Sequence, residues 1–292
     1  MSPMTTARAS APAKINLTLH VTGQRPDGYH LIDSLVVFAN VADQISASLS
    51  PDLTLSVSGP FSQGVPTDES NLVLRAARLL QSARNVPHGA AITLEKHLPH
   101  AAGIGSGSSD AAATLDLLAR LWDVPALPEG SAEVLALGAD VPVCLRAPQP
   151  ARMSGIGEIV APVPRLPECA MVLVNPRVPV PTGEVFARMR TKDNAPMDAV
   201  PEAMSFDSLA AWLANQRNDM TEEATELAPA IGHALQRLRA MPQVHHAAMS
   251  GSGATCYGLV RNMADARQVA RAIQVSEMAW WVAPAEVLSA VS

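Results

Sequence analysis

A Gly/Ser-rich segment, LPHAAGIGSGSSDAAATL at residues 98–115, constrains the fold of this chain more than any other stretch of its sequence. It contains three alternating glycines, Gly103, Gly105 and Gly107. Glycine permits positive φ and lets the backbone come close to a ligand. A Ser-Asp pair then opens an Ala-rich stretch that predicts a helix over 109–122. Because first-turn N–H groups and the helix dipole favour anions, the segment indicates a polyphosphate-binding loop.

Two familiar phosphate-binding motifs do not describe this segment. No Gly-Lys-Ser/Thr follows the glycines, so it is not a Walker A loop. No acidic residue ends a second strand at the distance that a dinucleotide-binding fold requires. A tight, well-capped turn without a ligand is the alternative that the residues alone leave open. The length of the segment and its three glycines favour a functional loop.

Apolar alternation and helical spacing predict the remaining elements. Strands are expected at 14–22, 33–49, 53–57, 90–96 and 170–176, with a strand pair at 246–250 and 254–260 around the turn Gly251-Ser252-Gly253. Helices are expected at 71–83 after an Asn71 cap, and at 131–137, 206–217, 222–240 and 263–274. The sequence QRPDGYH predicts a turn between the first two strands. Because no regular βαβ repeat is present, the fold class is α+β.

The chain is long enough for two domains. It has 292 residues, and its texture changes near residue 150, where stretches rich in proline and glycine begin. We therefore expect a first domain over 1–150 and a second over 151–292.

Bulk composition excludes several classes of protein. The net charge is −6, which argues against a nucleic-acid binder that depends on phosphate contacts. Hydrophobic residues make up 48% and charged residues 16% of the chain, as in globular proteins, and no window is long and apolar enough to cross a bilayer. The three cysteines are far apart and odd in number, so a reducing compartment fits them. We expect a bacterial cytoplasmic protein that does not bind membranes.

Three sequence motifs follow one another along the chain. They are PAKINLTLHV at 12–21, the segment at 98–115, and MSGSGATCYGLV at 249–260. Their sequence and order resemble the three motifs of the galactokinase–homoserine kinase–mevalonate kinase–phosphomevalonate kinase (GHMP) superfamily. The resemblance implies a ribosomal-protein-S5-domain-2-like N-terminal domain that binds ATP and a ferredoxin-like C-terminal domain that binds the substrate. It also implies that the third motif packs against the phosphate loop, although a hairpin turn is an alternative for it.

Further segments resemble one branch of the superfamily, the kinases of the non-mevalonate (MEP) isoprenoid pathway. They are GQRPDGYH at 23–30, LGADVPV at 137–143, GIGE at 155–158 and PTGEVF at 181–186. The implied reaction is ATP-dependent phosphorylation of the 2-hydroxyl of 4-diphosphocytidyl-2-C-methyl-D-erythritol. Another small-molecule kinase of the homoserine or mevalonate type, or a non-catalytic nucleotide-binding member, is the alternative.

The resemblance implies a role for each motif residue. Asp140 would be the catalytic base and Lys14 its electrostatic partner on the transferring phosphoryl group. The ATP cradle would be Pro99, His100, Ala101, Ala102, Gly103, Ile104, Gly105, Ser106, Gly107, Ser108 and Ser109. From the residues alone, a helix cap or turn is an alternative for Asp140, and a snorkelling strand residue for Lys14.

Five residues are implied in substrate binding: Asn16, Tyr29, His30, Thr182 and Phe186. Tyr29 and Phe186 would stack on the two faces of cytosine, and His30 would hydrogen-bond its edge. Each has an alternative role: ordinary packing for Tyr29 and Phe186, a surface histidine for His30, a polar strand residue for Asn16 and a turn hydroxyl for Thr182.

Other expectations are less specific. Mg²⁺ is expected with ATP, but no ligand cluster is visible, so none is assigned. We expect a monomer or a weak homodimer. The chain has only three lysines, and Lys96 and Lys192 are interpreted as present by chance.

Overall fold

The computed structural model describes residues 6–288 and divides into two compact units. Unit 1 comprises Met1–Ala13, Val41–His100 and Gly105–Ala147, and unit 2 comprises Lys14–Asn40, Ala101–Ile104 and Pro148–Ser292. The units are therefore interleaved along the chain, whereas the sequence suggested one boundary near residue 150. The chain passes between them five times, twice within the glycine-rich segment at 98–115.

Most strands are short, and β3 is the longest. They are β1 (Thr6–Asn16), β2 (His20–Gln24), β3 (His30–Ser50), β4 (Thr54–Ser58), β5 (Gly89–Glu95), β6 (Ala151–Gly155), β7 (Ile159–Pro162), β8 (Ala170–Asn175), β9 (His246–Met249), β10 (Cys256–Val260) and β11 (Trp281–Glu286). The helices are α1 (Leu72–Ala83), α2 (Ser106–Leu121), α3 (Ala132–Leu135), α4 (Val141–Cys144), α5 (Thr182–Arg188), α6 (Phe206–Ala214), α7 (Thr221–Leu227), α8 (Ala230–Arg239) and α9 (Met263–Ser276).

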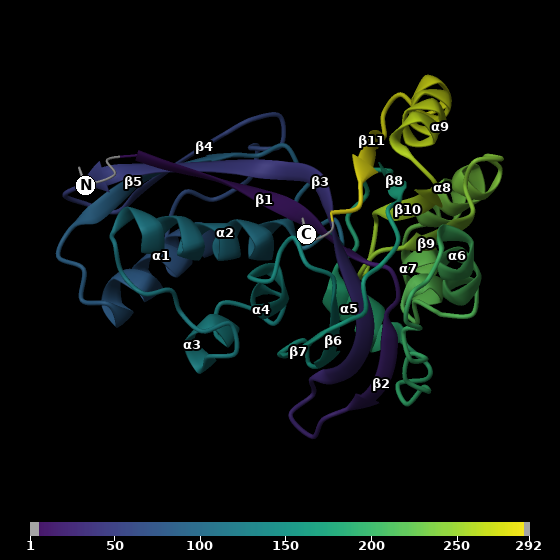
Figure 1. Ribbon diagram of the computed structural model, residues 1–292, viewed down its shortest axis with the longest axis horizontal. Helices are drawn as coiled ribbons and strands as arrows, with labels where there is room; N and C mark the ends of the chain where they lie inside the picture. The colour runs from purple at the N-terminus through teal and green to yellow at the C-terminus, as the bar shows by residue number, and fades with distance from the viewer. Residues whose placement is uncertain (1–5, 289–292) are drawn as a thin grey trace. The chain divides into compact units, whose positions relative to one another are not determined.

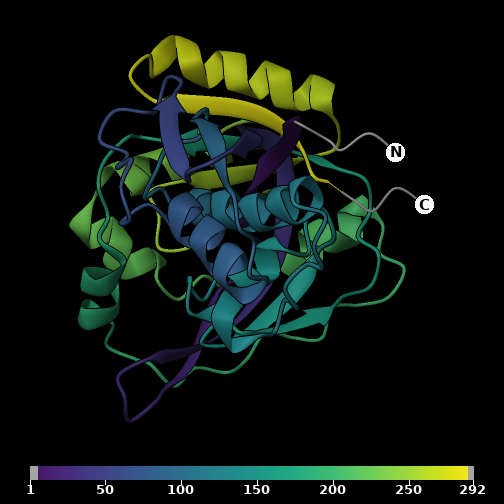
Figure 2. The same ribbon diagram turned by 90° about the vertical axis from the view of Figure 1, so that its left-hand side faces the viewer.

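In unit 1, two helices cover a sheet. The second part of β3 pairs antiparallel with β5, and β5 pairs parallel with β4. Helices α1 and α2 pack against each other and lie side by side below these strands (Figures 1 and 2). The Asn71 side chain accepts a hydrogen bond from Val73 N and caps α1, as the sequence predicted. α2 is buried along most of its length, from Ser106 in its first turn to Leu121 at its end.

Unit 2 contains two sets of paired strands. The first part of β3 pairs antiparallel with β2 and with β6, which in turn pairs with β7. A separate antiparallel sheet has the order β11-β8-β10-β9. Helix α8 packs on β9 and β10, and α9 packs on β8 and β11. Strands β8 and β10 are buried along their whole length, so they form the centre of this unit's core.

Several predicted elements differ from the observed ones. The strand predicted at 14–22 is two strands, because the pairing breaks between β1 and β2. The helix predicted at 222–240 is also two, since Pro229 stands at the start of α8 and cannot continue α7. The α+β class and the turn at QRPDGYH are confirmed.

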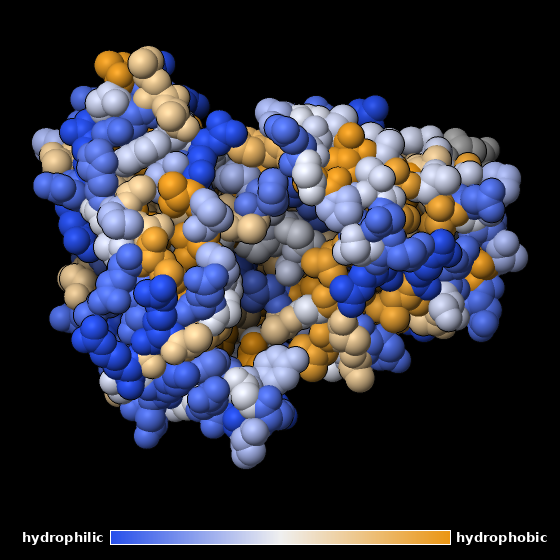
Figure 3. All heavy atoms as spheres, turned by 180° about the vertical axis from the view of Figure 1, so that it is seen from behind, coloured by the Kyte–Doolittle hydropathy of each residue, from blue (hydrophilic) through white to orange (hydrophobic). Residues whose placement is uncertain are grey.

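Few large apolar side chains are exposed in the described part of the chain. They are Tyr29, Leu49, Ile159, Val275 and Met278. On the face drawn in Figure 3, hydrophobic residues are interspersed with hydrophilic ones. No helix within residues 6–288 has the length and apolar character needed to span a bilayer.

Candidate active site

The helix that follows the glycines begins earlier than predicted. Gly105, at φ 57° and ψ 24°, precedes the first residue of α2, Ser106, whereas the sequence placed the start at Ser109. Ser109 N is the first amide in this turn to bond back along the helix, to Gly105 O at 2.9 Å. The preceding amides of the turn have no intrahelical acceptor. The last residues of the predicted ATP cradle therefore form the anion-favouring end of a helix.

Gly103 is held tightly by the third motif. Its φ is +75°, and an added Cβ would lie 2.3 Å from Ser250 O and 2.8 Å from Gly253 O. The Ser250 hydroxyl donates a hydrogen bond to Gly103 O at 2.8 Å, and Thr255 N donates to Ala102 O at 3.1 Å. The prediction that the third motif packs against the phosphate loop is confirmed. The motif is also a hairpin turn between β9 and β10, so both interpretations hold.

The first motif, at residues 12–21, is hydrogen-bonded to the glycine-rich loop by one bond within unit 1 and one within unit 2. In unit 1 the Ser109 hydroxyl donates to Pro12 O at 2.7 Å, and in unit 2 Lys14 N donates to Ile104 O at 3.0 Å. The Lys14 side chain is not a snorkelling surface group, because Lys14 is only 4% exposed. A buried ammonium is retained where it has charged or polar partners. Its burial is consistent with a role in chemistry.

Asp140 immediately precedes α4. Gly138, at φ 157°, turns the chain from the end of α3 into this short helix. Although Asp140 stands in the N-cap position, its side chain makes no capping hydrogen bond. The structure therefore gives no support to the helix-cap alternative for this carboxylate.

Asn16 lies next to the third motif. Its backbone N donates to the Ser250 hydroxyl at 3.1 Å, and its Nδ2 donates to the Ser34 hydroxyl at 2.7 Å. The amide oxygen Oδ1 is buried and has no hydrogen-bond partner. A buried polar atom without a partner is costly, so Oδ1 is a candidate acceptor for a ligand donor.

Thr182 is the first residue of α5 and contacts the same motif. Its hydroxyl is 2.7 Å from the Ser252 hydroxyl. Two of the predicted substrate residues, Asn16 and Thr182, thus contact the 250–253 turn directly.

The three remaining predicted substrate residues, Tyr29, His30 and Phe186, belong to the β2–β3 hairpin and α5. Tyr29 stands at the hairpin tip, where Arg25 N donates to Tyr29 O at 2.7 Å, and it is 59% exposed. It is not a core residue, which removes ordinary packing as its explanation. His30, the next residue, stacks on Phe186 with ring centroids 4.1 Å apart and an interplanar angle of 9°. Burial, and secondly the positive charge of Lys192, lower the pKa of His30.

Family models match both halves of the chain. The model of the GHMP kinases N terminal domain matches residues 71–147, and that of the GHMP kinases C terminal domain matches residues 198–277. Relatives that match over nearly the whole chain identify the family within this superfamily. A 4-diphosphocytidyl-2-C-methyl-D-erythritol kinase of Cereibacter sphaeroides is 54% identical over 282 residues, which cover 96% of this chain and 99% of the relative.

The chain belongs to the 4-diphosphocytidyl-2-C-methyl-D-erythritol kinase family of GHMP kinases. Family members of the same name from Jannaschia sp. and Ruegeria pomeroyi are 52% and 51% identical, over 98% and 96% of this chain and 99% of each relative. The predicted superfamily, branch and enzyme class are therefore confirmed. Membership of a kinase family also implies the use of ATP.

Solved structures agree with the family assignment. A crystal structure of 4-(cytidine 5'-diphospho)-2C-methyl-D-erythritol kinase matches with a TM-score of 0.75 and 32% identity, covering 97% of this chain and all of that chain. The mevalonate kinase of L. major matches with a TM-score of 0.71 at 12% identity, over 98% of this chain and 97% of that one, which shows the shared fold alone. The predicted two-domain GHMP kinase fold is confirmed.

One buried cluster of this erythritol kinase family member was not predicted from the sequence. Lys96 was interpreted as present by chance, and that interpretation is wrong. Its ammonium is buried and bonds both the Asp43 carboxylate and the Asp110 carboxylate, the latter at 2.7 Å. The available signal was a charged residue at the end of an alternating strand, next to the phosphate loop. Its partners could not be identified, because Asp43 is 53 residues away.

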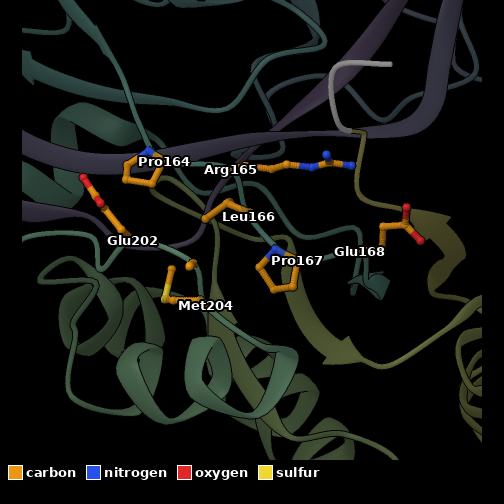
Figure 4. Close-up of a pocket in the computed structure, with 8 residues that line it drawn as sticks. Pro164, Arg165, Leu166, Pro167, Glu168, Glu202 and Met204 are labelled. Carbon is orange, nitrogen blue, oxygen red and sulfur yellow. The ribbon is translucent and has the colours of Figure 1, made fainter. Parts of the chain in front are cut away.

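A cavity of about 670 Å³ lies elsewhere, in unit 2. It is lined by two short segments, Pro164–Glu168 and Glu202–Met204 (Figure 4). None of the predicted site residues lines it. Its charged residues, Arg165, Glu168 and Glu202, are all exposed, so nothing in it is built around a buried polar group.

Proposed function

We propose that this chain transfers the γ-phosphoryl group of ATP to the 2-hydroxyl of 4-diphosphocytidyl-2-C-methyl-D-erythritol, a step of the non-mevalonate isoprenoid pathway. The observation that carries the proposal is 54% identity over 96% of the chain to a relative named for that kinase activity. The alternatives, a homoserine or mevalonate kinase, match the fold at 16% and 12% identity only. A non-catalytic member would not be expected to keep both Lys14 and Asp140.

ATP is assigned to the cradle Pro99–Ser109. Two features of the loop support this assignment. The first-turn amides of α2 lack intrahelical acceptors and suit a polyphosphate. The contacts of Gly103 with Ser250 and Gly253 fix the loop in a shape that no side chain at position 103 would permit.

The proposed chemistry uses one carboxylate and one ammonium. The 2-hydroxyl oxygen forms a bond to the γ-phosphorus, and the bond from that phosphorus to the β–γ bridging oxygen breaks, releasing ADP. Asp140 accepts the hydroxyl proton as this happens. Lys14 offsets negative charge on the transferring group.

The cytidylyl group is assigned to the aromatic residues of unit 2. Tyr29 and Phe186 would stack on cytosine, and the neutral His30 ring would hydrogen-bond its edge. Stacking tolerates any base, so the edge contact would supply the selectivity. Asn16, through its unpartnered Oδ1, and Thr182 would bind donors on the rest of the substrate.

Mg²⁺ is assigned no protein ligand. Within residues 6–288, no three His, Cys, Asp or Glu side chains are grouped so that they could hold a metal ion by themselves. Mg²⁺ in ATP-dependent enzymes commonly keeps waters and binds the nucleotide phosphates with one or two protein oxygens. Such an ion would neutralise phosphate charge.

We further propose a bacterial cytoplasmic location and a monomer or weak homodimer.

Thermal shift with a panel of ligands tests the substrate class. We expect ATP, CDP and CTP each to raise the melting temperature, and homoserine and mevalonate to leave it unchanged. Stabilisation by ATP without any by CDP or CTP would remove the cytidylyl assignment.

A further inference from the structure

Lys96 is the centre of a buried ionic triad in unit 1. The residue follows the end of β5, and its Nζ bonds an oxygen of Asp43 on β3 and an oxygen of Asp110 on α2. The side chains of the three residues are 2%, 0% and 4% exposed, respectively. Charges at this depth are retained only where they are paired.

The triad holds the chain on both sides of the phosphate loop. The second Asp43 oxygen accepts hydrogen bonds from His97 N at 2.6 Å and Leu98 N at 2.8 Å, which are the last amides before Pro99. Asp110 is the first residue after Ser109, the end of the cradle. One buried cluster therefore fixes the chain that enters the loop and the helix turn that leaves it.

The charge balance of the triad depends on Asp110. Two carboxylates face one ammonium, so an ionised Asp110 leaves a buried net charge of one negative unit. Burial, partly offset by Lys96 and reinforced by Asp43, raises the pKa of Asp110 to about 7. Its Oδ1 is buried without a hydrogen-bond partner.

The helices packed against α2 add no charge of their own at this depth. The buried side chains of α1 and α4 are Val73, Leu74, Ala76, Ala77, Leu80, Val141, Pro142, Val143 and Cys144. A neutral Asp110 therefore gives a triad without net charge beside the helix end that is assigned to the polyphosphate.

We propose that Lys96, Asp43 and Asp110 are positioning residues for ATP: they hold the two ends of the phosphate loop in the arrangement that binds the triphosphate. The proposal rests on the ATP site of the proposed function and adds to it three residues outside the 99–109 cradle. They act through the loop and touch neither substrate nor ATP.

Equilibrium binding of a non-hydrolysable ATP analogue to the full chain tests the proposal. Lys96→Met should raise the dissociation constant of the analogue by about tenfold or more, while that of CDP stays within about twofold. Asp116→Asn is the control, because it removes a carboxylate from an exposed position of the same helix. Urea unfolding of each variant identifies the conditions under which that variant is folded, and binding is measured under those conditions. Unchanged analogue binding by folded Lys96→Met, or an equal loss for analogue and CDP, would show a merely structural role and overturn the proposal.

A second variant covers the case in which Lys96→Met does not fold. Asp110→Asn keeps an oxygen for Lys96 and fixes the triad in its uncharged state. Analogue binding by the wild type should weaken as the pH rises through about 7, because Asp110 then ionises, whereas binding by Asp110→Asn should not change. Identical pH profiles for the two proteins would contradict the proposal. The pH comparison uses the ATP analogue alone, so it can fail or succeed independently of the substrate assignment.

Discussion

His30 and Phe186 form a parallel stack, with ring centroids 4.1 Å apart and planes within 9° of each other. The pair joins the start of β3 to helix α5, two segments that are more than 150 residues apart in the sequence. His30 Nε2 is buried and has no hydrogen-bond partner. The stack therefore offers an aromatic surface together with an unsatisfied ring nitrogen, the two features that recognition of a base requires.

Phe186→Ala should weaken binding of the cytidylyl substrate. Loss of base stacking costs about 1–3 kcal/mol, so we expect KM for this substrate to rise about tenfold or more while KM for ATP stays near the wild-type value. Steady-state kinetics with each substrate varied in turn measures both. Phe206→Ala is the control, since this ring is partnered by Arg261 and His245, not by His30. An unchanged KM for the cytidylyl substrate would reject Phe186 as a stacking residue.

Acceptor binding should depend on pH through His30. Its pKa is lowered below the ordinary value of 6.5, first by burial and then by Lys192, so the ring is neutral at pH 7. We expect KM for the cytidylyl substrate to be constant from about pH 7 to 8 and to rise as the pH falls through the lowered pKa, where a protonated ring can no longer accept a hydrogen bond. His30→Gln should lose this acid-side rise. His233→Gln, which changes an exposed histidine, should keep it.

Gly103→Ala and Gly107→Ala form a matched pair within the loop. At position 103 the added Cβ would meet Ser250 O at 2.3 Å and the backbone must also hold φ +75°, so we expect a loss of about 2 kcal/mol or more in the free energy of unfolding. At position 107 the nearest atom would be Leu72 Cδ1 at 3.6 Å, and alanine favours the helix by up to about 1 kcal/mol. Urea denaturation compares the two. Equal stability of the two variants would show that the close approach at Gly103 is absent in solution.

Asp140→Asn should abolish turnover and spare binding. The amide cannot accept the hydroxyl proton, so we expect kcat to fall by several orders of magnitude while dissociation constants for ATP and CDP remain near those of the wild type. Single-turnover kinetics and calorimetry measure these separately. Asp123→Asn is the control, because Asp123 is exposed at φ 54°, a conformation that asparagine tolerates. A variant at position 140 that turns over at close to the wild-type rate would exclude Asp140 as the base.

Local signals in the sequence predicted the local structure well. Asn71 before an apolar periodic run identified the start of α1. The alternating glycines identified the phosphate loop and, through the resemblance, its contact with the 250–253 turn. The start of α2 was placed three residues late, because Ser109 and Asp110 are strong capping residues and the helical turn before them contains a glycine.

Long-range pairing was not accessible from the sequence. The buried bond between Lys96 and Asp43 depends on the register of β3 against β5, where Gln44 lies opposite Glu95. No local pattern in the sequence indicates that register, so the interpretation of Lys96 as present by chance could not be corrected from the sequence alone. The stack of His30 on Phe186 was missed for the same reason.

Turnover with a panel of acceptors is the most direct measurement. ATP consumption is followed with 4-diphosphocytidyl-2-C-methyl-D-erythritol, homoserine and mevalonate in parallel, and the position of the new phosphoryl group is read by ³¹P NMR. We expect phosphorylation of the first compound at its 2-hydroxyl and no turnover of the other two. Phosphorylation of homoserine or mevalonate in preference to the cytidylyl compound would contradict the proposed function.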